Sequence, residues 1–148
     1  MGLRSPIHSL ARLLNPLNAR CGLQSIFHPG YQGVHRDASG LLGDNVIVVK
    51  GDGGEVEINP DTLSHLYGTT GGQSWDEEWP ALSAQRHVKP ASLEPEHLKA
   101  LWRGDVEDSY PQLALIATMA LALRGLGHAR EQAFELAQQY WDARDKSI

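Results

Sequence analysis

The pattern of hydrophobic and polar residues in the first half of the chain predicts two strands with a helix between them. Residues 23–27 alternate apolar and polar side chains up to His28-Pro29-Gly30, which predicts a strand that runs into a tight loop. A helix is predicted over 32–42. Val46-Ile47-Val48-Val49 is a continuous β-branched run, typical of a strand buried on both faces. Strand, helix and strand in this order predict a βαβ unit with a right-handed crossover.

The carboxyl ends of these two strands are the expected ligand-binding edge. In open α/β sheets, ligands bind beyond the carboxyl ends of parallel strands. Those ends are His28-Pro29-Gly30 and Lys50-Gly51-Asp52-Gly53-Gly54. The glycines of the second segment let backbone approach a ligand closely, because they carry no Cβ atom.

The regions on either side of the βαβ unit predict shorter elements. Ser5-Pro6 is a typical helix start, and apolar residues follow at helical spacing until Asn15-Pro16 forces an end. After the glycines, residues 55–59, 63–67 and about 73–79 alternate in polarity, which predicts two or three short antiparallel strands.

Three helices are predicted for the last third of the chain. The first begins near Leu93, and the second spans Pro111–Leu126 and is apolar almost all round, as expected of a central buried helix. The third spans Arg130–Arg144 and places six large or small apolar side chains on one face: Ala133, Phe134, Leu136, Ala137, Tyr140 and Trp141. The chain is therefore expected to be an α/β protein.

Composition and length narrow the class of protein. A chain of 148 residues, 41% of them hydrophobic, has the size of one globular domain. One cysteine, Cys21, cannot form an internal disulfide. The longest apolar run, Leu113–Leu123, is about half of the roughly 20 residues that a membrane span needs, and the first residues lack a signal-peptide core. We expect a cytoplasmic protein without a membrane partner.

The two signs of charge are unevenly distributed. Residues 1–50 carry five basic and two acidic groups, a net charge of +3, whereas the remaining residues carry eight and sixteen, a net charge of −8. The total of −5 argues against bulk attraction to nucleic acid. A basic beginning and an acidic remainder nevertheless offer different surfaces to different partners.

Several residues suggest chemistry without defining it. Three carboxylates beside the glycines, at Asp52, Glu55 and Glu57, could hold a magnesium ion or a phosphate, or be the solvated acids of a glycine-rich hairpin. Cys21 lacks a nucleophile motif around it. Other side chains fit either a ligand role or ordinary packing: His8, His28, His35 and Asp37 match no compact metal-ligand spacing, and Trp75, Trp79, Trp102 and Trp141 could stack on bases or fill the core.

The motifs together resemble those of a known family. The segment from Gly2 to Pro16 is similar, without a gap, to the segment of anthranilate phosphoribosyltransferases, in glycosyl transferase family 3, that ends in asparagine-proline. The strand before His28-Pro29, the run Val48–Gly54 and the last three helices follow in the family's order. The resemblance is closer still to its nucleic-acid-binding paralogues, the YbiB type, at Arg4-Ser5-Pro6, His28-Pro29-Gly30, Lys50-Gly51 and Leu101-Trp102-Arg103-Gly104.

This resemblance implies a particular domain organisation. The family has a small helical domain and a large α/β domain, with ligands in the cleft between them. The chain is similar only to the later part of the large domain. By this expectation residues 1–148 form an incomplete C-terminal α/β domain, without the helical domain that makes the family's dimer contact and without the pyrophosphate-binding loop. Partners expected on this basis are the missing N-terminal domain or another copy of the chain, with a homodimer at full length.

Departures from the family pattern bear on activity. The enzymes' magnesium-binding aspartate-glutamate pair corresponds to Val56-Glu57, and valine cannot coordinate a metal ion, which leaves Glu55 as a substitute. Arg4 matches the arginine that approaches anthranilate, but His8 stands in place of an asparagine. A transferase acting on an aromatic amine or nucleobase would accordingly use magnesium and phosphoribosyl pyrophosphate, with substrate-binding residues Arg4, His8 and Asn15 and metal ligands Glu55 and Glu57.

The leading hypothesis is a non-catalytic protein that binds DNA or RNA through phosphates, with little dependence on base sequence and without a cofactor. Arg4, Arg12 and Lys50 are its predicted phosphate contacts, with Arg20 as a further candidate. The alternatives are the phosphoribosyl transfer described above and a remnant or interaction subunit that binds no ligand.

Overall fold

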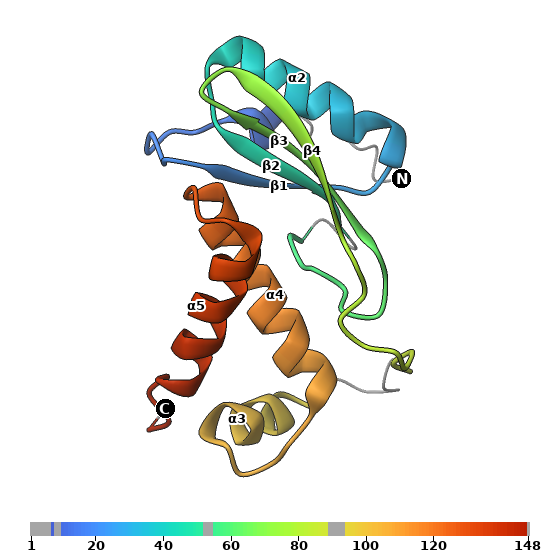
Figure 1. The fold of residues 1–148 in the computed structure, drawn as a ribbon, viewed down its shortest axis with the longest axis vertical. Helices are drawn as coiled ribbons and strands as arrows, with labels where there is room; N and C mark the ends of the chain where they lie inside the picture. Colours follow the sequence, from blue (N-terminus) through green and yellow to red (C-terminus); the bar gives the residue numbers. More distant parts are fainter. Residues whose placement is uncertain (1–6, 8–9, 52–54, 89–93, 148) are drawn as a thin grey trace.

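The computed structural model describes residues 7, 10–51, 55–88 and 94–147. Within them the chain forms a four-stranded sheet and four α-helices (Figure 1). The strands are β1 (Gly22–Ile26), β2 (Val46–Lys50), β3 (Ser64–Thr70) and β4 (Gln73–Trp79). The helices are α2 (Gln32–Leu42), α3 (Pro95–Arg103), α4 (Ser109–Gly125) and α5 (Arg130–Asp142), with short 3-10 turns η1 (Ala11–Leu13) and η2 (Pro29–Tyr31).

The sheet is mixed and has the order β1-β2-β3-β4. Strands β1 and β2 are parallel, with Gly22 opposite Val46 and Ile26 opposite Lys50, and α2 connects them. Strands β3 and β4 continue the sheet in antiparallel fashion. The predicted α/β class and βαβ unit are confirmed, and the carboxyl ends of β1 and β2 lie at the same edge of the sheet.

Helices cover the two faces of the sheet differently. Helix α2 lies along one face, whereas α4 and α5 stand on the other with their connecting turn next to the sheet, and α3 lies at their far end (Figure 1). Strand β2 is buried on both faces, as predicted: Val46 and Val48 belong to a small cluster with Ile26 and Tyr67, while Ile47 and Val49 join the main core.

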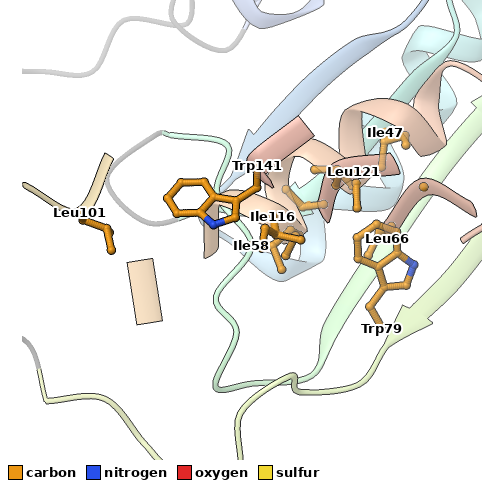
Figure 2. Close-up of a cluster of buried hydrophobic side chains, with 13 residues drawn as sticks. Ile47, Ile58, Leu66, Trp79, Leu101, Ile116, Leu121 and Trp141 are labelled. Carbon is orange, nitrogen blue, oxygen red and sulfur yellow. The ribbon is translucent and has the colours of Figure 1, made fainter. Parts of the chain in front are cut away.

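The main core joins the sheet to the C-terminal helices. Ile47, Leu66 and Trp79 project from the strands toward side chains of α4 and α5 (Figure 2). The Trp79 ring lies 4.9 Å from the Phe134 ring, measured between centroids. Ala117, Ala120 and Leu121 of helix α4 are fully buried, and none of residues 110–125 is exposed, so the prediction of α4 as the central buried helix is confirmed.

Two details differ from the expected elements. Residues 55–59 are not a strand: the Ile58 side chain is buried and its N–H donates to Thr118 Oγ1 at 3.1 Å, so this segment is a loop attached to α4. Two antiparallel strands follow it. Tyr140, predicted on the buried face of α5, is 56% exposed, because only the narrower stripe through Ala137 and Trp141 faces the core.

The predicted N-terminal helix is described only in part. Its start at Pro6 lies outside the described residues, and η1 gives way to extended backbone at Leu14, just before Asn15-Pro16 as expected. Among the described helices, none combines the length and apolar character that a bilayer crossing requires.

The Trp75 ring lies directly across Gly68 and leaves no room for a larger side chain there. Gly68 pairs with Trp75 across β3 and β4, and a Cβ atom at Gly68 would come within 2.1 Å of the ring. Gly68→Ala should therefore lower the free energy of unfolding by about 1–3 kcal/mol through overpacking. Urea denaturation monitored by tryptophan fluorescence measures this change. Gly30→Ala is the control, since nothing lies within 4 Å of a Cβ there. Equal effects of the two substitutions would contradict the packing described.

Candidate nucleic-acid interface

Three aromatic rings lie at the carboxyl end of β1. Phe27 and His28 follow the strand, and Tyr31 closes the η2 turn, where its N–H donates to the His28 carbonyl at 3.0 Å. Ring centroids are 5.1 Å apart for Phe27 and His28, and 6.3 Å apart for His28 and Tyr31, both edge to face. Phe27 is 52% exposed and Tyr31 60% exposed, and His28 is exposed as well. We call these three residues the aromatic cluster.

A cation adjoins the aromatic cluster from the neighbouring strand. Lys50 ends β2 opposite Ile26, one residue before Phe27, and its side chain is exposed. Gly51 follows and is buried, with its N–H donating to the Ile26 carbonyl at 3.4 Å. A Cβ atom at Gly51 would overlap the Ser25 hydroxyl oxygen at 1.5 Å, so the close approach of the two strand ends requires glycine.

The amino terminus of α2 also faces this edge of the sheet. Tyr31 occupies the N-cap position without a side-chain hydrogen bond, and the first turn holds no acidic residue. Free N–H groups at a helix N-terminus favour anions such as phosphate. The first residue of α2, Gln32, has a buried side chain whose Nε2 has no hydrogen-bond partner among the described residues. Aromatic faces, one cation and backbone donors thus meet at the predicted ligand edge.

The other predicted contacts do not all share this edge. Arg20 precedes β1 at the amino end, and six residues of extended chain separate it from the register position of Lys50, which is a distance of roughly 20 Å. The two cations therefore cannot hold a single phosphate. Arg4 and His8 lie outside the described residues, and so does the side chain of Arg12.

Asn15 has a structural role at the amino end of the sheet. Its Oδ1 accepts from the Ala19 N–H at 2.8 Å, and its Nδ2 donates to the Ala19 carbonyl at 3.0 Å and to Asp44 Oδ1 at 3.4 Å. These bonds close the loop before β1, and they place Asn15 with Arg20 rather than with Lys50.

The two carboxylates of the alternative metal site lie in the loop after Gly51. Glu55 and Glu57 are both exposed, while Val56 between them packs against the core. Alternation in an extended segment puts both carboxylates on the same side. Magnesium is often held by one or two carboxylates together with substrate phosphates, so Glu55 and Glu57 fit that role only with a bound phosphate ligand. Across the described part of the chain, no group of three potential metal ligands occurs.

The four tryptophans serve packing, the second of the two interpretations. Trp79 and Trp141 are 2% and 6% exposed, and Trp75 and Trp102 are partly buried against the main core. The exposed rings at the predicted ligand edge are instead Phe27 and Tyr31, which the sequence patterns did not indicate. Their signal was position: both flank the His28-Pro29-Gly30 loop at a predicted strand end.

Known proteins do not identify this chain. Protein-family profiles do not match it, and a search of curated proteins finds no relative. The assignment of a site therefore rests on the geometry described above.

Partial burial controls the reactivity of the Cys21 thiol. Desolvation raises the pKa of the Cys21 thiol above its ordinary value, and a hydrogen bond with the Ile47 backbone offsets only part of that rise. The thiol should react with an aromatic disulfide reagent more slowly in the folded protein than in urea at pH 8, because less thiolate is present. Because the thiol pKa is higher in the folded than in the unfolded protein, the free energy of unfolding should decrease as pH rises above the ordinary pKa of a thiol.

The control for this experiment is Cys21→Ala, which removes both the reaction and the pH-dependent loss of stability. A folded-state thiol that reacts faster than the unfolded one would contradict the burial of Cys21 and point to an activated thiolate.

Proposed function

We propose that this protein binds nucleic acid without catalysing a reaction, and that it has an anthranilate phosphoribosyltransferase-like fold. The βαβ unit, the antiparallel strands and the C-terminal helices occur in the order that the resemblance implies. The aromatic cluster beside Lys50 is the observation that carries the functional proposal. Exposed aromatic rings next to a cation are the means by which proteins bind single strands without regard to base sequence.

The geometry favours single-stranded nucleic acid over a duplex. Bases can stack on Phe27, His28 or Tyr31 only when they are unstacked from one another, as in a single strand. Lys50 and the N-terminus of α2 would hold the phosphates between such bases. Arg4 and Arg12 remain the predicted contacts for neighbouring phosphates of the strand.

The separation of the cations also suits a polymer. Arg20 and Lys50 lie too far apart to bind one small phosphate compound, whereas a strand of several nucleotides is long enough to reach both ends of β1. The net charge of −5 does not oppose this, because contacts within about one Debye length, about 8 Å in physiological salt, dominate the attraction.

Removing the Tyr31 ring should weaken binding of a fluorescent oligothymidine. Tyr31→Ala is expected to lower affinity by about 1–3 kcal/mol, or about 5- to 150-fold, because one stacking surface is lost. Tyr31→Phe should bind as tightly as the unmodified protein. Tyr140→Ala is the matched control, since Tyr140 is similarly exposed on α5, away from the sheet edge. Fluorescence anisotropy measures all three variants, and equal losses for Tyr31→Ala and Tyr140→Ala would contradict this site.

Replacing Lys50 should reduce the salt dependence of binding. Lys50→Gln is expected to lower the magnitude of the slope of log K against log salt concentration by about 0.7 for a single strand, because one phosphate contact and its counterion release are lost. Lys146→Gln, near the C-terminus, should leave the slope unchanged. Further replacement of Arg4 and Arg12 should extend the decrease.

Two results would overturn the proposed function. One is a folded protein that shows no salt-dependent binding of single-stranded DNA or RNA. The other is magnesium-dependent turnover of phosphoribosyl pyrophosphate that is lost in Glu57→Gln, which would favour the transferase alternative.

A further inference from the structure

Helix α2 turns polar side chains toward the sheet and apolar side chains toward solvent. Gln32 and Ser39 face the sheet and are 3% and 1% exposed. Across the contact, Gln24 Nε2 donates to Ser39 Oγ at 3.1 Å, and Gln24 Oε1 lies 3.3 Å from His35 Nδ1. The helix is thus attached to its own sheet through hydrogen bonds, and its apolar side is left uncovered.

The uncovered side of α2 is a continuous stripe. Val34, Leu41 and Leu42 are 58%, 91% and 64% exposed, and Ala38 lies between them. Spacings of three and four residues place these positions on one side of a helix. Amphipathic helices of single domains normally bury such a stripe, so the arrangement points to a surface that is covered in an assembly. We call these four residues the α2 stripe.

Two further exposed leucines lie in the segment that is held near the end of α2. Asn15 donates to Asp44, two residues after Leu42, and so holds the preceding segment near the C-terminal end of the helix. Leu14 and Leu17 on either side of Asn15 are 73% and 89% exposed.

The exposed area limits the strength of any contact made here. The three large side chains of the α2 stripe, together with Leu14 and Leu17, are about three-quarters exposed on average. These five side chains present roughly 400 to 500 Å² of apolar surface per molecule. Doubled across a symmetric contact, this is close to the lower limit of about 1,000 Å² for a specific interface. Such an area predicts reversible association.

We propose that a second copy of this chain covers the α2 stripe, through an antiparallel α2–α2 contact with its two-fold axis at Ala38. The stripe is self-complementary about that residue: Val34 on one side would meet Leu42 of the partner on the other, and the small Ala38 side chain lets the helices approach closely.

Charge on the helix permits this pairing. Asp37 is the acidic residue beside the stripe, and within each chain it already accepts from Arg36 Nε at 2.8 Å. Arg36 also pairs with Asp76 of β4. Two copies therefore bring together compensated ion pairs rather than two bare carboxylates, and the desolvated centre of the contact carries no charge.

Sedimentation equilibrium on the full chain tests the interface. The average mass should rise toward that of a dimer as the concentration increases through the micromolar range. Leu41→Glu should weaken dimerisation more than about 100-fold, because it buries two unpaired carboxylates. Leu98→Glu is the control at an exposed leucine of α3 and should leave dimerisation unchanged. Circular dichroism verifies that both variants fold. A monomer at every concentration, or a dimer that survives Leu41→Glu, would overturn the proposal.

Cross-linking tests the symmetry axis. In a Cys21→Ala background, Ala38→Cys should give a covalent dimer with a short bis-maleimide, because the two-fold axis brings the same position of both copies together. Glu135→Cys on the exposed side of α5 should remain monomeric on the same gel. Equal cross-linking at both positions, or none at position 38, would overturn the two-fold axis at Ala38.

Discussion

The burial of β2 on both faces is the constraint on which the remaining structure depends. Its four β-branched residues are at most 3% exposed, so both faces of the sheet must be covered by other elements. Parallel pairing with β1 requires a crossover, which is α2, and antiparallel pairing with β3 provides the other neighbour. The same parallel pairing sets the carboxyl ends of β1 and β2 side by side. The candidate interface is thus a consequence of the central strand.

The two layers that cover the sheet use different chemistry. The C-terminal helices pack through apolar side chains, supplemented by Arg124, which stacks 4.5 Å over the Trp75 ring and donates to Glu77 at 2.9 Å. Glu77 in turn accepts from Trp79 at 2.8 Å, so β4 and α4 are joined by a chain of partly buried contacts. Helix α2 relies on hydrogen bonds and on Arg36, whose pKa is raised first by the hydrogen bond to Asp37 and then by Asp76. This difference leaves Val34, Leu41 and Leu42 of α2 exposed.

Arg144 joins α3 to α5 at the end of the helical layer that is far from the sheet. Arg144, just after α5, stacks 3.6 Å over the Trp141 ring and donates to the carbonyl oxygens of Leu101 and Trp102. Those carbonyls belong to the last turn of α3, where the Leu101 oxygen also accepts from the N–H of the C-cap residue Gly104 at 3.1 Å. Arg144 therefore adds hydrogen bonds at the end of α3 and attaches it to α5. This end of the helical layer lies away from the sheet (Figure 1).

The sequence by itself determined where the elements lie. Alternation over 23–27, the β-branched run over 46–49 and the apolar helix α4 are local patterns, and a local pattern is sufficient to place a strand or a helix. Only the tertiary structure decided which groups meet. It set Lys50 opposite Ile26 at the end of β1 where the aromatic cluster follows, placed Arg20 at the other end of that strand, and turned the apolar side of α2 outward. Such relations depend on strand order and direction, and these follow from contacts between residues that are distant in the chain.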